Sequence, residues 1–319
     1  MQRPLAGIAA ALLLGATACG SGDSAGSAPD GDGITEVNVG VIPIVDVAAL
    51  YLGEREGIYE KHGLDITMTT AQGGSAIVPG VVSGQFQFGF SNTTSLMVAQ
   101  SNGVQVKAVS GGVATTGVDG EDYGALVVKE GGSLKSAKDL EGRTVAVNTL
   151  KNILDTSVRE SVRKAGGDPS KVKFVELAFD QMPAALEQGQ VDAAMAVEPA
   201  LTTMLDQGGV QLASPYVDVA EDLTVALYFT SQEYAERNPA VVEKFQQATA
   251  EALAYANSHP DEVRDIVSTY TEIPASVLAE MTLPKWPADI SRSSVQRLER
   301  LGEQDGLFKT APDLDELLP

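Results

Sequence analysis

The residues best suited to hold a small molecule lie in polar loops that follow the predicted strands of this chain. In the first part of the chain they are Asp46, Gly74, Ser75, Ser91, Asn92 and Thr93. In the second part they are Asn148, Thr149, Asn152, Asp155 and Glu198. Parallel sheets bind ligands where strand ends meet helix N-termini, so these residues predict a ligand cleft between two facing sets of loops. The free N–H groups of helix N-termini suit an anionic or carbonyl group of the ligand.

Each of these residues also has an alternative role in capping a helix. Asp46 and Asp155 are natural N-caps, and residues 157–160 (SVRE) fit a capping box. Tyr228, on a later strand, offers a ligand its hydroxyl or its ring, with core packing as the alternative. Trp286 is expected in a loop that packs on the first lobe. Capping explains single residues, whereas the whole set favours a cleft.

The sequence carries little that suggests catalysis. It has no G-x-G-x-x-G, Walker A, H-E-x-x-H or G-x-S-x-G pattern, and residues 161–164 (SVRK) match S-x-x-K without its partner motifs. The two histidines, His62 and His259, are expected at helix boundaries. A single cysteine excludes an internal disulfide and a Cys-rich metal site. We therefore expect no catalytic residues, no metal site and no cofactor.

Strands and helices alternate twice along the chain in the same order. The first series has strands at 37–44, 64–69 and 86–90 and helices at 46–60 and 77–82. The second series has strands at 144–147, 172–177 and 191–197 and helices at 155–164 and 182–187. Such alternation predicts two mainly parallel sheets flanked by helices.

The second series is predicted to be an insertion into the first. Short apolar strands at 125–128 and 225–229 flank it, and the chain from Gln232 onward is almost wholly helical. We therefore predict an α/β protein with two lobes joined by a two-strand hinge. The expected boundaries are 34–126 for the first part of lobe 1, 127–224 for lobe 2 and 225–319 for the return to lobe 1.

The first 33 residues predict export and a membrane anchor. A basic start, an apolar run too short to span a bilayer and a group of small residues predict a signal peptide at 1–18. Residues 16–19 (ATAC) resemble a bacterial lipobox, which makes Cys19 the expected lipidation site. The alternative is a simple cleavage site with an incidental Cys19. Residues 19–33, rich in Gly, Ser and Asp, are expected to form a flexible tether.

Composition narrows the possible partners. The chain of 319 residues has 22 Lys and Arg against 43 Asp and Glu, a net charge of −21. Such a surface repels phosphate backbones and anionic lipid headgroups, so we expect no nucleic acid partner and contact with a membrane only through the lipid anchor. We expect a monomer.

Residues 57–66 (GIYEKHGLDI) resemble the early signature of bacterial ABC-transporter solute-binding proteins of the SsuA/THI5-like (NMT1) group. Residues 73–75 (GGS), 82–85 (VSGQ), 136–147 (SAKDLEGRTVAV) and 185–193 (ALEQGQVDA), with Glu198-Pro199, agree with that group. The resemblance covers roughly residues 37–199 well and the helical tail loosely. It implies the type II periplasmic-binding-protein fold.

The resemblance also implies a function. Members of the group serve sulfonates, nitrate, taurine and pyrimidine precursors of thiamine. A receptor at the outer face of the cell membrane closes on its solute and docks on an ABC permease, whose ATPase drives uptake. Val197 departs from the group, which often has an aromatic residue before the Glu-Pro pair. The yeast synthase of the group relies on a Cys-rich iron segment that this chain lacks, so its activity does not carry over.

Several functions and ligands stay open at this stage. A receptor for an ABC importer leads, and the alternatives are a ligand sensor for a membrane kinase and an extracellular enzyme. The predicted cleft loops contain no Arg, and Lys151 is their only cation, which disfavours a strongly anionic ligand and leaves a neutral or nitrogen-rich heterocycle open. Helix N-termini can nevertheless hold a sulfonate or nitrate without any cation.

Overall fold

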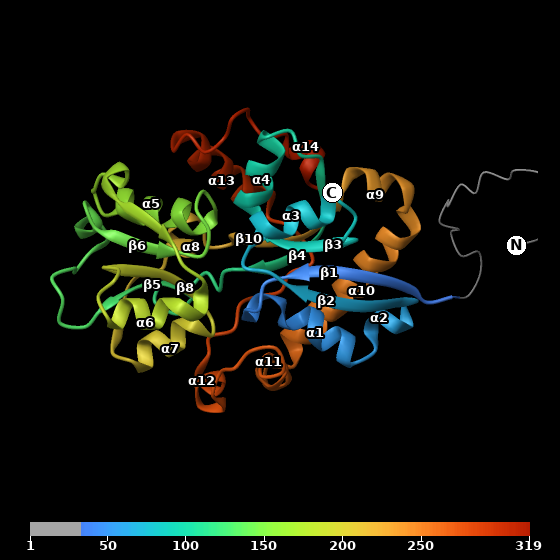
Figure 1. The fold of residues 1–319 in the computed structure, drawn as a ribbon, viewed down its shortest axis with the longest axis horizontal. Coiled ribbons are helices and arrows are strands. Elements are labelled where there is room, and N and C mark those ends of the chain that lie inside the picture. The colour runs from blue at the N-terminus through green and yellow to red at the C-terminus, as the bar shows by residue number, and fades with distance from the viewer. Residues whose placement is uncertain (1–32) are drawn as a thin grey trace, which may run out of the picture. The chain divides into compact units, whose positions relative to one another are not determined.

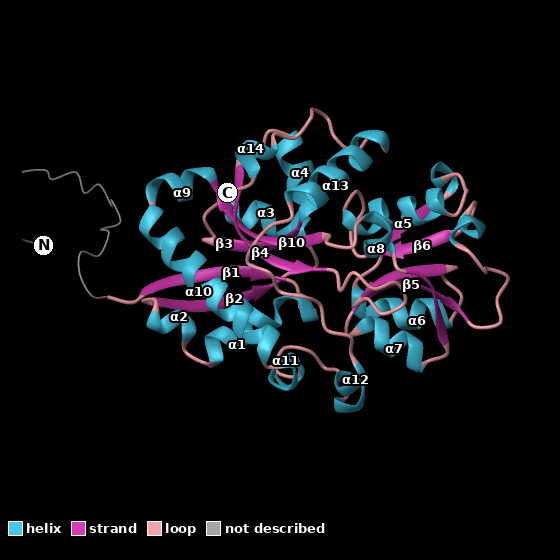
Figure 2. Ribbon diagram, turned by 180° about the vertical axis from the view of Figure 1, so that it is seen from behind, coloured by secondary structure: helices cyan, strands magenta, loops and turns pink. Residues whose placement is uncertain are grey.

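The computed structural model describes residues 33–319, which form two five-stranded sheets with helices on both faces of each (Figure 1 and Figure 2). The strand order is β2-β1-β3-β10-β4 in the first sheet and β7-β6-β8-β5-β9 in the second. We call the first sheet with its helices lobe 1 and the second lobe 2. The predicted fold class, two α/β lobes, is confirmed.

The strands are short, as expected for a sheet buried on both faces. Their bounds are β1 Thr35–Val41, β2 Leu64–Thr70, β3 Phe88–Asn92, β4 Val106–Ala114, β5 Gly124–Lys129, β6 Thr144–Val147, β7 Lys173–Glu176, β8 Ala193–Val197, β9 Gly209–Ala213 and β10 Thr224–Ser231.

The helices fall between the strands and fill most of the tail. The α-helices are α1 Ala48–Arg55, α2 Ile58–Lys61, α3 Gly74–Val82, α4 Thr93–Ser101, α5 Ile153–Lys164, α6 Met182–Glu187, α7 Ala200–Asp206, α8 Pro215–Val219, α9 Gln232–Arg237, α10 Pro239–Ser258, α11 Pro260–Val267, α12 Ala275–Glu280, α13 Arg292–Gln304 and α14 Leu314–Leu317. The 3-10 helices are η1 Val45–Val47, η2 Ala137–Leu140, η3 Pro169–Lys171 and η4 Phe179–Gln181. Among the described residues, no helix is both long and apolar enough to cross a bilayer.

Both sheets share one topology. In each, the first three strands run parallel and the fourth runs antiparallel to both of its neighbours. The fourth strands are β10 and β5, which correspond to the two short apolar strands predicted beside the second series. The chain thus builds the same layered arrangement twice, and in both lobes the parallel strand ends lie next to helix N-termini.

The core of lobe 1 lies between its sheet and the long helix α10. Phe88 of β3 stacks on Phe245 of α10 with ring centroids 3.9 Å apart. Ala248 and Ala252 continue this buried stripe, whereas Val241 is half-buried near the start of the helix. The buried residues recur at spacings of three and four, as expected for one core-facing side of a helix.

Several element boundaries differ from those predicted. The helix expected at 46–60 is divided into η1, α1 and α2, because Gly57 takes a left-handed conformation with φ of 68° between the last two. Strand β3 extends two residues further than expected, so Ser91 and Asn92 end the strand instead of following it. Strands β4 and β9 and helices α4 and α7 were not predicted.

The two lobes are joined by segments without regular structure, not by two strands that cross between them. Strand β5 belongs wholly to the second sheet and β10 wholly to the first, so the chain passes between lobes at residues 115–123 and 220–223. The two passages touch each other, since the Thr115 amide donates a hydrogen bond to the Leu223 carbonyl at 3.1 Å. The first passage precedes the predicted boundary at 126.

Candidate functional site

Seven predicted residues lie where the loops of the two lobes meet. We call this set the inter-lobe site: Asp46, Asn92, Asn148, Thr149, Asn152, Asp155 and Glu198. All seven side chains are buried. Buried polar groups of this kind require partners, and those partners show how the lobes fit together.

Asn92 connects the two lobes directly. Its side-chain oxygen accepts a hydrogen bond from the Ser95 amide at 2.8 Å and thereby caps α4 in lobe 1. The same oxygen accepts a hydrogen bond from the Ile153 amide, the first residue of α5 in lobe 2, at 3.3 Å. One side chain therefore satisfies helix N-termini from both lobes.

Asn148, Thr149 and Asn152 form a hydrogen-bonded cluster at the start of α5. The Asn152 amide group donates to Asn148 Oδ1 at 2.7 Å and to Thr149 Oγ1 at 2.8 Å. Gln72 of lobe 1 donates to the Asn148 carbonyl at 3.4 Å, and Asn148 donates to the Gln72 carbonyl at 3.5 Å. A methyl group added at Gly73 would lie 2.8 Å from Thr149 Cγ2, so only glycine allows this close approach of the lobes.

Asp155 has a different capping role from the one expected. Asn152, not Asp155, is the N-cap of α5, and Asp155 completes the capping box from the third helical position. The capping box predicted at 157–160 is wrong, because the Ser157 hydroxyl donates to the Ile153 carbonyl within the helix. Asp46 lies inside η1 and makes no cap there.

Asp46 and Glu198 lie at a second junction of the lobes. The Val45 amide donates to the Glu198 carbonyl at 3.2 Å. The Tyr123 hydroxyl donates to Asp46 Oδ1 at 3.4 Å, and the Trp286 indole N–H donates to the Asp46 backbone carbonyl at 3.0 Å. Trp286 packs on lobe 1 as expected, and its indole lies directly beside the inter-lobe site.

Burial changes the acidity of three carboxyl groups in this site. It raises the pKa of Asp46 from 3.8 to about 7, although hydrogen bonds from its own backbone and from Tyr123 oppose the change. It raises the pKa of Glu198 from 4.5 to about 7 and that of Asp155 from 3.8 to about 6. These three carboxyl groups therefore resist ionisation as long as they are buried.

The remaining predicted residues are less directly placed for a ligand. Ser75 is exposed on α3, whereas Gly74 is buried against Ser91, whose hydroxyl donates to the Asn92 carbonyl at 3.3 Å. The Thr93 hydroxyl donates to the carbonyls of Thr224 and Val225, at 3.0 and 3.2 Å.

Tyr228 packs in the core of lobe 1. Its ring lies 5.2 Å from that of Phe90 and 5.9 Å from that of Phe245, as in the packing alternative. Its buried hydroxyl finds no hydrogen-bond partner among the described residues. Cys19 lies outside the described residues.

A groove of about 700 Å³ opens beside the inter-lobe site. Its walls come from the ends of β1 and β2, from η4 and the start of α6, from the start of α7, and from residues 270–273. Gln72 lines the groove and also bonds to Asn148, and the Tyr270 hydroxyl donates to the Ile44 carbonyl at 3.1 Å. The groove therefore borders the site. Tyr270 was not predicted because it lies in the helical tail, and Phe179 was not predicted because the search followed polar residues after the strands.

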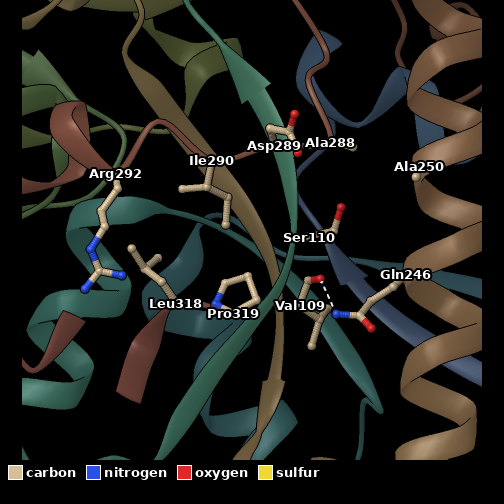
Figure 3. Close-up of a pocket in the computed structure, with 10 residues that line it drawn as sticks. All are labelled: Val109, Ser110, Gln246, Ala250, Ala288, Asp289, Ile290, Arg292, Leu318 and Pro319. Atoms are coloured by element: carbon tan, nitrogen blue, oxygen red, sulfur yellow. Dashed lines mark hydrogen bonds between the residues drawn. The ribbon is translucent and has the colours of Figure 1, made fainter. Parts of the chain in front are cut away.

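A second pocket, of about 580 Å³, lies in lobe 1 between β4, α10, residues 288–292 and the end of the chain (Figure 3). Gln246 donates to the Val109 carbonyl at 2.8 Å across its wall, and Asp289 and Arg292 are its charged side chains. None of the predicted residues lines this pocket. Because it draws residues from one lobe and its tail only, it lacks the two-sided enclosure of the inter-lobe site.

Ion pairs join the lobes at the other end of α5. Arg163 of α5 pairs with Asp305 at the end of α13 and, at 3.3 Å, with Glu160. Arg297 of α13 reaches Glu160 at 2.6 Å. The side chains of Glu160 and Asp305 are each only 6% exposed. Helix α13 also packs against α4, so the cluster connects lobe 2 to lobe 1.

Metal binding has no evident place in the described part of the chain. Residues 33–319 contain no group of three or more His, Cys, Asp or Glu side chains arranged to hold an ion. The inter-lobe carboxyl groups accept hydrogen bonds from protein amides and hydroxyls instead.

The sequence profile of the family described as NMT1/THI5 like matches residues 44–263. The taurine-binding periplasmic protein of Escherichia coli K12 is 25% identical over 226 residues, covering 70% of this chain and 68% of that protein. The zinc-bound ligand-binding component of an ABC-type import system from Staphylococcus aureus has a TM-score of 0.78 at 17% identity, covering 89% of this chain and 96% of the other. The periplasmic aliphatic sulphonate-binding protein SsuA from Escherichia coli has a TM-score of 0.73 at 19% identity, covering 88% and 96%. These structures share the fold of this chain.

Proposed function

The chain belongs to the NMT1/THI5-like family, and from this membership we propose that it is an extracytoplasmic solute-binding receptor for an ABC importer. It binds a small organic or nitrogen- or sulfur-containing solute between its lobes and delivers it by cleft closure. The relatives named above are binding proteins, which supports a receptor without catalytic activity.

The observation that carries this proposal is the set of direct hydrogen bonds between lobes. They run from Ile153 to Asn92, from Val45 to Glu198, and in both directions between Gln72 and Asn148. The lobes are joined by only two short passages, and a groove lies between them. This arrangement supports a closed form that a solute favours through contacts it makes to both lobes at once.

The receptor would act outside the membrane. We propose that residues 1–18 are removed as a signal peptide, that Cys19 carries the lipid anchor and that residues 19–33 are the tether. We set the first passage between the lobes at 115–123 and keep the other predicted lobe boundaries as part of the proposal. The closed form of the monomer would dock on the permease, whose ATPase drives uptake.

A thermal-shift panel tests the proposal. We expect at least one solute among sulfonates, taurine, nitrate, pyrimidines, riboflavin and amines to raise the melting temperature. A solute at one hundred times its Kd adds about 2.7 kcal/mol to the free energy of unfolding. The Asn148→Ala/Glu198→Ala variant should lose the shift, whereas the exposed control pair Asn102→Ala/Glu130→Ala should keep it.

Two results would contradict the receptor proposal. One is a panel in which no solute changes the melting temperature of the wild-type protein. The other is chemical conversion of the bound solute, detected by mass spectrometry after incubation with the purified protein, which would indicate an enzyme.

A further inference from the structure

One carboxylate oxygen of Asp46, in the inter-lobe site, has no hydrogen-bond partner among the described residues. The residue is 3% exposed, and Tyr123 supplies the hydrogen bond to Oδ1. Oδ2 is buried and has no hydrogen-bond partner among the described residues. An unpaired carboxylate oxygen in such a position is unfavourable until a donor or a cation reaches it. It therefore marks a place for a ligand group that donates hydrogen bonds or carries positive charge.

Aromatic side chains contact Asp46 and the backbone just before it. Tyr123 bonds to its side chain, Trp286 bonds to its backbone, and Tyr270 bonds to the carbonyl of Ile44, two residues earlier. Tyr216 lies with its ring 5.7 Å from that of Tyr123. Faces of tyrosine and tryptophan rings attract cations, most strongly where water is excluded. A carboxylate among aromatic rings is a combination that suits a cationic nitrogen.

Several donors that could hold an anion are already occupied. The Ile153 and Ser95 amides donate to Asn92, and the Thr202 amide donates to Glu198 at 3.0 Å. The N-termini of α4, α5 and α7 therefore give these amides to side-chain oxygens of the protein itself, whereas no side chain caps α3.

Charge in the adjoining groove points the same way. Among the described residues that line it, none is Lys, Arg or His, whereas Asp180 and Glu272 both contribute to its walls. Lys151, the cation of the predicted cleft loops, is exposed. The charged side chains along this groove are both acidic, so they would repel an anion and attract a cation.

We propose that the solute is an organic amine or another cationic nitrogen base, and that its nitrogen pairs with the Asp46 carboxylate among these aromatic rings. This inference rests on the proposed receptor function and names its ligand class. It resolves the choice that the sequence left open between an anionic and a nitrogen-rich ligand. The groove is lined by Tyr270 and by Ile44, two residues before Asp46.

The single tryptophan of the chain provides the test, because Trp286 contacts Asp46 and its fluorescence reports on this site. Methyl-, butyl- and benzylammonium chloride are titrated against sodium methane-, butane- and benzylsulfonate of matched carbon skeleton. We expect at least one ammonium ion to change Trp286 emission and raise the melting temperature, and the sulfonates to do neither. Asp46→Asn should weaken ammonium binding at least tenfold.

Further variants separate the role of Asp46 from its effect on folding. Tyr270→Leu removes one aromatic face but keeps the carboxylate, and we expect it to weaken ammonium binding several-fold. Asp289→Asn, in the pocket of Figure 3, removes an acid outside the inter-lobe site and should leave binding unchanged. Circular dichroism establishes that each variant is folded.

The outcomes distinguish this inference from the receptor proposal. Binding of sulfonates alone would overturn the ligand class and leave the receptor function standing. Ammonium binding that is equally tight in folded Asp46→Asn and wild-type protein would overturn the assignment of Asp46. Failure of both probe series would overturn the ligand class but not the receptor function, which would fall if the whole thermal-shift panel also failed.

Discussion

Replacing Asp46 with asparagine should stabilise the ligand-free protein at pH 8 and leave its stability at pH 5 nearly unchanged. Burial raises the pKa of this carboxyl group from 3.8 to about 7. Between these values the native state keeps a proton that the unfolded chain releases. The stabilisation from this group is therefore complete below pH 4 and is lost as the pH rises through 7.

The size of the effect follows from the same pKa values. A difference of one pKa unit corresponds to about 1.4 kcal/mol, so the change from 3.8 to about 7 corresponds to about 4 kcal/mol. Asparagine stays neutral throughout and can still accept the Tyr123 hydroxyl, but its amide group needs a partner, at a cost of about 1–2 kcal/mol. That cost is the same at both pH values, and the wild-type loss from pH 5 to about 7 spans about two pKa units. We therefore expect the free energy of unfolding of Asp46→Asn, relative to wild type, to be about 3 kcal/mol higher at pH 8 than at pH 5.

Urea unfolding followed by circular dichroism measures this difference. Glu198 and Asp155 also have raised pKa values, but they are present in both proteins and cancel in the comparison. Asp65→Asn, at an exposed position on β2, is the matched control and should show the same small effect at both pH values. If Asp46→Asn differed from wild type equally at pH 5 and pH 8, the reasoning about the buried carboxyl group would be wrong.

Two further variants test how the lobes are held together. Gly73→Val brings its side chain against Thr149 and should cost about 1–3 kcal/mol of stability and increase the radius of gyration in small-angle scattering, whereas Ser75→Val at the exposed neighbour should do neither. Arg163→Met should lower the free energy of unfolding by about 3–5 kcal/mol, because it leaves the buried Asp305 carboxylate without its ion-pair partner. In a double-mutant cycle, the double variant Arg163→Met/Asp305→Leu should lose about 0.5–3 kcal/mol less stability than the sum of the two single variants. If the two losses were strictly additive, this ion pair would not couple the helices.

Much of the fold could be predicted because apolar runs and turn residues alternate clearly. Strand β6 and helix α6 have the predicted bounds, since each is a short apolar segment between polar residues. The helix expected at 46–60 was less accurate, because a left-handed glycine at 57 divides a pattern that otherwise reads as continuous. Strand β9 was missed because Gly209 and Gln211 interrupt its short apolar pattern.

The prediction of the site followed one rule, and it missed residues for a physical reason. Residues that follow parallel strands, such as Asn148 and Glu198, could be identified because the topology brings those strand ends together. Trp286 and Tyr270 reach the site from the helical tail, and no local pattern shows where a loop of the tail will pack. The orientation of single side chains was also hidden, which is why Ser75 was included although it is exposed.

The adjacent entry and exit of lobe 2 make it an exchangeable module. The Thr115 amide and the Leu223 carbonyl are 3.1 Å apart, so a brief turn would suffice to reconnect lobe 1 after the intervening hundred or so residues were excised. The excised piece keeps its own five-stranded sheet and has neighbouring ends. Lobe 2 could therefore be exchanged between homologous receptors to make chimeras. Such chimeras would show which lobe determines the preference for a solute.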